Sequence, residues 1–234
     1  MELIFNLKNP SKIISLLLSL TINFGLNAYE LEPYEAQYVT SIYGITASGK
    51  RTLKRISHNK YILNMKVNFL WFGLSESTEF IINDNNVKTL KYSYKVSGTG
   101  NKKNINMIFD KKNSILRKDI NGKKTKHIIK GRLYDKLSYQ IQMRLDLLKD
   151  QNVNKLKYIV ADHNNISEYE FLKKNKNKDK DNSEASIIFE RIKNNKFTRI
   201  WFSSTKDFFP EKFYLKKGKE EQTITLEDFK FIHN

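Results

Sequence analysis

One stretch of this sequence has the spacing of a phosphate-binding loop, but its context argues against that chemistry. Residues 44–50 read Gly-Ile-Thr-Ala-Ser-Gly-Lys and match the first seven positions of the P-loop pattern. The eighth position is Arg51, where a serine or threonine hydroxyl would be needed to hold magnesium. Residues 52–57 then alternate as a strand does, whereas phosphate binding requires the N-terminus of a helix there. We interpret the two glycines as parts of a hairpin turn.

The histidines and serines give no stronger catalytic pattern. No histidine stands four residues from another, so a metal site would need ligands from distant strands. Asp162 and His163 are adjacent at an expected turn, where both residue types are ordinary. Ser75 lies in the sequence GLSES, which lacks the closing glycine of a nucleophile elbow. The histidines are His58, His127, His163 and His233.

Glu76 and Glu79 are the nearest approach to a pair of catalytic carboxylates. Their spacing places them on opposite faces of a strand, and we expect each to pair with a lysine of a neighbouring strand. The chain has no cysteine, which excludes disulfides, thiol nucleophiles and cysteine-ligated zinc. We therefore expect a protein that is not an enzyme, with no catalytic residue, no metal and no cofactor.

Residues 132–149, RLYDKLSYQIQMRLDLLK, are the only segment after the N-terminus with the pattern of an amphipathic helix. Leu137, Ile141 and Leu145 share one helical stripe and are expected to face a sheet. Asp135 places a carboxylate in the expected first turn, as the helix dipole favours. Gln142 lies on the flank of that stripe and is expected to be exposed.

Almost every other segment of the chain is predicted to be a strand. Tyr61, Leu63, Met65, Val67 and Phe69 form an apolar set at alternate positions of one long strand, as in a sheet with a single buried face. About a dozen short strands at regular spacing predict a mainly β fold, with one curved antiparallel sheet and one packed helix. The expected strands are 36–43, 50–57, 61–69, 76–83, 90–96, 105–109, 114–120, 125–130, 155–161, 166–172, 185–192, 197–203, 212–215 and 223–232.

The N-terminus is predicted to be a targeting segment. Lys8 and Lys12 precede an apolar run at residues 13–26, and a small residue, Ala28, follows at the expected cleavage site. We interpret residues 1–28 as a signal peptide for the periplasm, or alternatively as a retained anchor in the inner membrane through 13–26. Residues 29–234 are then one β-rich domain, with a flexible polar loop at 173–184.

The chain is strongly basic, with a formal net charge of +17. Two interpretations of this charge are open. One is a solvated surface with a biased composition, and the other is attraction to an anionic membrane or envelope polymer. Nucleic acid is not an expected partner, because no basic cluster accompanies a recognition fold.

Short sequence pieces, spread over nearly all of the chain after residue 28, have a particular order and spacing. They are Tyr38, Gly44, Tyr61, Ser75-Glu76-Ser77, Phe80, Tyr92-Ser93-Tyr94, Asp135-Lys136-Leu137-Ser138, Gln142, Arg144, Tyr158–Asp162, Tyr169-Glu170-Phe171, Arg191, Trp201-Phe202, Asp207 and Pro210. Together they resemble the exported bacterial proteins of domain-of-unknown-function family 3108. The resemblance implies a periplasmic β protein and assigns no catalytic residue. Its architecture is similar to the open barrels of lipoprotein carriers, in which a curved sheet and a helix enclose an apolar cavity.

The leading hypothesis is therefore a periplasmic protein that binds a lipid or other apolar ligand between sheet and helix, for envelope maintenance. The alternative is an envelope structural or interaction protein that acts through its basic surface. The residues expected to line the cavity are Tyr61, Leu63, Met65, Val67, Phe69, Leu137, Ile141 and Leu145.

Overall fold

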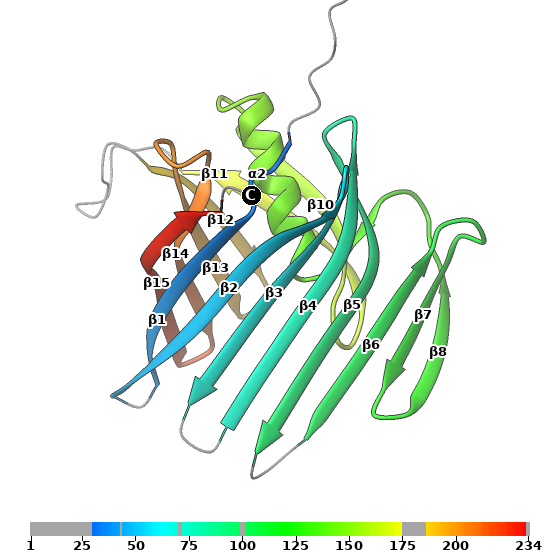
Figure 1. Ribbon diagram of the computed structural model, residues 1–234. Coiled ribbons are helices and arrows are strands. Elements are labelled where there is room, and N and C mark those ends of the chain that lie inside the picture. Colours follow the sequence, from blue (N-terminus) through cyan, green and yellow to red (C-terminus); the bar gives the residue numbers. More distant parts are fainter. Residues whose placement is uncertain (1–29, 43, 70–71, 99–101, 175–185, 233–234) are drawn as a thin grey trace, which may run out of the picture.

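The computed structural model describes residues 30–42, 44–69, 72–98, 102–174 and 186–232, which build one open, barrel-like sheet around a helix (Figure 1). The sheet has 15 strands and does not close on itself. The mainly β class with one curved sheet and one packed helix, predicted from the strand pattern, is confirmed. In the first half of the sequence the strands are β1 (Tyr34–Ile42), β2 (Ile45–Ser57), β3 (Lys60–Phe69), β4 (Phe72–Asn83), β5 (Asn86–Gly98), β6 (Lys103–Asp110), β7 (Ile115–Ile120) and β8 (Lys123–Ile128).

The second half begins with a short strand and the helix. Its elements are β9 (Leu133–Tyr134), α2 (Ser138–Lys149), β10 (Lys155–Ala161), β11 (Ile166–Lys173), β12 (Ser186–Lys193), β13 (Lys196–Ser203), β14 (Phe209–Lys217) and β15 (Glu220–Phe231).

The sheet consists of two meanders joined at the first and last strands. The order is β8-β7-β6-β5-β4-β3-β2-β1-β15-β14-β13-β12-β11-β10-β9, and every pair is antiparallel except β9 with β10. Tyr34 of β1 stands opposite Phe231 of β15, so the strands nearest the two ends of the described chain lie side by side. The two free edges of the sheet are β8 and β9, the helix follows β9 in the sequence, and the strands curve around it (Figure 1).

The burial of side chains alternates along the strands and shows which face of the sheet is turned toward the interior. In β3 the side chains of Tyr61 and Leu63 are buried, whereas the alternate residues Ile62 and Asn64 are only half-buried. The pairing register shifts in β1, β2, β4 and β13, for example between Glu79 and Phe80. Such irregularities increase local twist and bend a strand, which helps a long sheet to curl around its contents.

The helix is shorter than the sequence pattern predicts, because residues 133–134 form β9 instead of a first helical turn. Leu133 and Tyr134 pair with Ile159 and Val160 of β10. Asp135 follows, and its Oδ1 accepts hydrogen bonds from the backbone N–H groups of Leu137 and Ser138, at 2.7 and 3.0 Å. The carboxylate thus satisfies the free N–H groups where the helix starts.

The helix is buried around most of its circumference, which is more than the amphipathic pattern predicts. Leu137, Ile141 and Leu145 are buried, as expected for the apolar stripe. Gln142, however, is only 2% exposed, and the prediction of an exposed flank fails there. Its Oε1 accepts a hydrogen bond from the Val87 N–H, and its Nε2 donates to the Asn85 carbonyl. The side chain is polar because it completes the backbone hydrogen bonds of the β4–β5 turn.

The glycines of the P-loop-like stretch serve a β-hairpin. Gly44 has φ +79°, and β2 begins directly after it at Ile45, so the expected long turn at 44–49 is mostly strand. A Cβ at Gly49 would lie 3.0 Å from Cγ2 of Val67, so a larger residue here would have to displace that side chain. No helix N-terminus follows the stretch, so it lacks the anion-binding geometry of a P-loop.

Several sequence-based expectations fall outside the described residues. The signal peptide at 1–28 lies there, as do His233 and most of the expected polar loop at 173–184. Lys173 itself ends β11, and its N–H donates to the carbonyl of Asn154. In the part of the chain that the structure describes, no helix has the length and apolar character needed to cross a membrane.

The buried helix leads to a stability prediction. Ile141→Ala should lower the free energy of unfolding by about 2–5 kcal/mol, because the side chain is buried inside the sheet. Lys149→Ala, an exposed change in the last turn, should cost less than about 0.5 kcal/mol. Urea unfolding followed by circular dichroism measures both, and equal small losses would show that the helix is not a core element.

Candidate functional site

A cavity of about 820 Å³ opens inside the curved sheet, next to the start of α2. Strands β1–β4 provide one side of its wall and β11–β15 the other, while Leu137 and its neighbours cover one end. Its apolar lining comes from both meanders. The apolar and aromatic lining residues are Tyr38, Met65, Leu137, Tyr139, Tyr169, Phe197, Phe213, Leu215 and Ile224. Among the described residues, a curved sheet with one short helix inside it therefore leaves ligand-sized space.

Of the eight residues expected from the sequence to line a cavity, the structure places two, Met65 and Leu137, in the wall. Tyr61, Leu63, Ile141 and Leu145 lie in the packed core, and Val67 and Phe69 are half-buried outside the lining. Most aromatic side chains also pack against one another: the ring centroids of Tyr61 and Phe80, for example, are 5.6 Å apart. The cavity is therefore set further from β3 than the apolar pattern alone indicates.

The wall also carries charges, which the sequence reasoning did not place there. Arg51 is 3% exposed, its Nε donates to Tyr34 Oη at 3.1 Å, and its Nη1 donates to Gln140 Oε1 at 2.7 Å. Gln140 in turn donates to the carbonyl of Lys136, which ties β2 to the first turn of α2. The pairing of these groups fixes the Arg51 guanidinium at the cavity wall.

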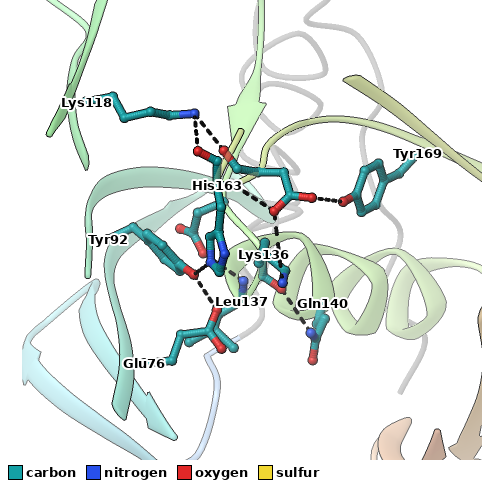
Figure 2. Close-up of polar contacts among 10 residues, drawn as sticks. Glu76, Tyr92, Lys118, Lys136, Leu137, Gln140, His163 and Tyr169 are labelled. Carbon is teal, nitrogen blue, oxygen red and sulfur yellow. Dashed lines mark hydrogen bonds and ion pairs between the residues drawn. The ribbon is translucent and has the colours of Figure 1, made fainter. Parts of the chain in front are cut away.

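A buried hydrogen-bond network lies beside this wall. Figure 2 shows Tyr92 between Glu76 and His163. The Tyr92 hydroxyl donates to Glu76 Oε1 at 2.6 Å, and its oxygen lies 2.9 Å from His163 Nε2. Because the hydroxyl has one proton and gives it to Glu76, Nε2 of His163 must be the donor in the second bond. The geometry thus selects the imidazole tautomer that carries its proton on Nε2.

Burial shifts the protonation of this network. Desolvation raises the pKa of Glu76, and the nearby Lys136 charge opposes that rise. Desolvation, followed by the Lys136 charge, lowers the pKa of His163 to about 4. Desolvation and the carboxylate of Glu76 raise the pKa of Tyr92 far above its usual value. At neutral pH His163 is therefore uncharged and Tyr92 keeps its proton.

Lys118 holds the β10–β11 turn in place beside the Glu76–Tyr92–His163 network through hydrogen bonds. Its Nζ donates to the carbonyls of Asp162 and His163, at 2.7 and 3.2 Å (Figure 2). The Asp162 carboxylate then faces Lys136 at 4.0 Å and accepts from Tyr169 Oη at 3.4 Å. Burial raises the pKa of Asp162, but Lys136 and the His163 N–H outweigh it, so the pKa is lowered. This turn is more than a surface loop, because it brings Asp162 to the cavity.

Arg191 of β12 completes the wall. Its side chain is 9% exposed, and its guanidinium carbon lies 3.8 Å from the centroid of the Tyr169 ring. Among the described residues, its buried Nε has no hydrogen-bond partner. Buried polar atoms are nearly always hydrogen-bonded in folded proteins, which makes this one an exception.

The remaining sequence candidates do not form a reaction centre. Glu79 pairs with Lys60 and Lys91, at 3.2 and 3.9 Å, as expected. Glu76 does not follow that expectation: it points to the concave face and is bonded by Tyr92 instead of an adjacent-strand lysine. Ser75 is exposed on the outer face. Within the described residues, no group of three or more metal-ligating side chains gathers.

The charged residues of the cavity wall, which were not among the expected lining residues, can be recognised in part from the sequence. Arg51 stands two positions before buried Leu53, and Glu76 stands four before buried Phe80, so each charge shares a face with apolar side chains. A charged residue in the apolar register of a strand marks either a buried site or a strand end. Strand alternation alone does not decide between these two, because it contains no information on what lies opposite.

The fold and the cavity define a class: an open β-barrel-like protein with an internal helix. The chain belongs to the family described as "Protein of unknown function (DUF3108)", whose sequence profile matches residues 34–225. No curated protein matches the chain. Among solved structures, it is similar to a "Beta-barrel-like Protein of Domain of Unknown Function DUF1849 from Brucella abortus", with a TM-score of 0.59 and 8% sequence identity. That match covers 88% of this chain and 100% of the other, and at such low identity it shows the fold alone.

The lowered pKa of His163 gives a pH prediction. The unfolded chain binds the imidazole proton near pH 6.5, whereas the folded chain binds it only near pH 4. The stability that neutral His163 contributes should therefore decrease as pH falls from about 6.5 to about 4. Ring resonances of His163 in NMR should titrate near pH 4, and His163→Gln should remove this part of the pH dependence of unfolding. His127→Gln, on the exposed strand β8, should leave it in place; titration of His163 near pH 6.5 would contradict the network.

Proposed function

We propose that this protein binds a lipid or another apolar ligand in the cavity between its sheet and α2, and that it serves envelope maintenance in the periplasm. The single observation that carries the proposal is the cavity of about 820 Å³, with aromatic and aliphatic side chains on both walls. Water is a poor filler for apolar space, whereas an acyl chain gains about 0.8 kcal/mol for each buried methylene. A chain-shaped ligand therefore matches the size and lining of the cavity.

A binding role fits the wall better than catalysis does. Glu76, Tyr92 and His163 are bonded to one another inside the protein, and a second layer of contacts holds Asp162. A general acid or base has to reach the proton that it transfers, and these groups are already engaged. The network is therefore assigned to holding the β10–β11 turn against the sheet, where it shapes the cavity.

The basic surface supports a second candidate function. Strand β8 forms one edge of the sheet, and all six of its side chains are exposed, with lysines at 123, 124 and 126. A charged strand at a sheet edge guards against unwanted strand pairing, and it also attracts anionic surfaces. Interaction with an anionic membrane or envelope polymer through this surface is the alternative that the ligand test below decides.

The export part of the proposal has its own test. The basic residues and the short apolar run at 13–26 support cleavage after Ala28. Mature protein from a fractionated native host should be periplasmic and begin near Tyr29 on N-terminal sequencing. An intact Met1 in the membrane fraction would favour the anchor instead, and an intact Met1 in the cytosol would contradict export.

The ligand part is tested with a neutral probe. The uncharged dye N-phenylnaphthylamine should bind the mature protein with micromolar affinity and gain fluorescence, because the cavity offers apolar walls. Met65→Arg should weaken binding about tenfold or more by placing a charge in that wall. Ile56→Arg, the same change at an exposed position of β2, should have no effect.

Circular dichroism must show that each variant is folded. A second variant, Leu215→Trp, fills the cavity without adding charge and should also reduce binding. Absence of dye binding to the wild type at any salt concentration would remove the cavity proposal and leave the basic surface as the better explanation.

A further inference from the structure

We infer that the ligand of this cavity is an anionic amphiphile, whose carboxylate or phosphate headgroup is bound by Arg191 together with Lys136 and Arg51. The inference rests on the proposed function, because it assigns the polar end of the same ligand. It goes beyond that function by stating where the headgroup lies and what charge it carries.

Arg191 is the residue that carries the inference. Its side chain lines the cavity and is 9% exposed, yet in the described part of the chain no hydrogen bond reaches its Nε and no carboxylate forms an ion pair with it. Tyr169 supplies only a ring face, at 3.8 Å from the guanidinium carbon. A buried charge without a counter-ion is costly, and an anionic group in the cavity would remove that cost. Guanidinium also matches planar carboxylate and phosphate groups with two parallel hydrogen bonds.

Two further cations belong to the same part of the wall. Lys136 lies 4.0 Å from Asp162, and Asp162 accepts from Tyr169, over which Arg191 is stacked. Arg51 reaches Lys136 through Gln140. Side-chain contacts thus connect Lys136 to Arg191, and Arg51 is connected to the backbone of Lys136 through Gln140.

The charge balance of the lining also favours an anion. Among the described residues, six cations and four carboxylates line the cavity, so the formal sum is positive. Glu221 and Lys216 pair with each other, so their charges cancel and the excess of cations over carboxylates is unchanged. The cations are Arg51, Lys136, Arg191, Lys196, Lys216 and Lys217, and the carboxylates are Glu76, Asp162, Glu220 and Glu221.

The helix itself does not supply the anion site. The Asp135 carboxylate already accepts hydrogen bonds from the N–H groups of Leu137 and Ser138, so these groups at the N-terminus of α2 are not open to a ligand. The headgroup therefore depends on side chains. The same cavity is also lined by Phe213, Leu215 and Ile224 of β14 and β15, which offer apolar surface along which an acyl chain can lie.

The test compares ligands with one chain and different headgroups. Decanoate, decyl phosphate and decanol each displace N-phenylnaphthylamine in competition titrations of the folded wild type. At least one anionic ligand should bind about tenfold more tightly than decanol, because a charged hydrogen bond is added to the same buried chain. The tighter of decanoate and decyl phosphate identifies the headgroup as carboxylate or phosphate.

The residue assignment uses a matched pair of variants. Arg191→Gln should reduce the affinity for the preferred anion about tenfold and leave decanol within about twofold of wild type. Lys54→Gln removes the same charge from the exposed side of β2 and should change neither affinity. If Arg191→Gln does not fold, Lys136→Gln, at a more exposed position of the same cluster, replaces it.

The outcomes separate this inference from the proposed function. Equal binding of decanol and both anions to the wild type would overturn the headgroup site and keep the apolar cavity. An anion preference that survives in Arg191→Gln but is lost in Lys54→Gln would also overturn it, in favour of the outer surface. Displacement by none of the three ligands would overturn the cavity function and the headgroup together.

Discussion

The buried polar bonds that hold α2 inside the sheet are the constraint on which the rest of the structure depends. Asp135 is 0% exposed and accepts a hydrogen bond from Thr78 Oγ1 at 2.6 Å, while it also caps the helix. Gln142 closes the β4–β5 turn through Val87. A sheet that does not close must cover its concave face with something, and these bonds decide where its one described helix is placed. Leaving any of them unpaired in the interior would cost about 1–3 kcal/mol.

Where the helix is placed determines where space remains. With Asp135 bonded to β4 and α2 packed against β5, the volume beside the first turn of the helix is bounded by β1–β4 and by β11–β15. The two meanders meet there because β1 pairs with β15, which are the first and last strands of the described chain. The cavity is thus a consequence of topology: the chain returns to its own first strand, and one 12-residue helix is too short to fill what the strands enclose.

The wall of that space combines two environments that sequence-level reasoning treats separately. Aromatic and aliphatic side chains form one environment, and charged side chains such as Arg51, Lys136 and Arg191 form the other. Electrostatic interactions are stronger in the low dielectric of the interior. A cation with an unpaired N–H group, such as Arg191, is therefore more costly here than on the surface. A ligand with an apolar chain and an anionic end satisfies both parts at once.

The sequence by itself determined the mainly β class, most of the strands, the position of α2 and the membership of family 3108, because these follow from local alternation and from the order of short pieces along the chain. It also singled out Met65 and Leu137. Only the tertiary structure decided that Gln142 is buried and that Arg51 and Arg191 face a common space. The physical reason is that burial of a polar side chain depends on partners distant in sequence: periodicity assigns a residue to a face, but the curvature of the sheet decides what that face meets.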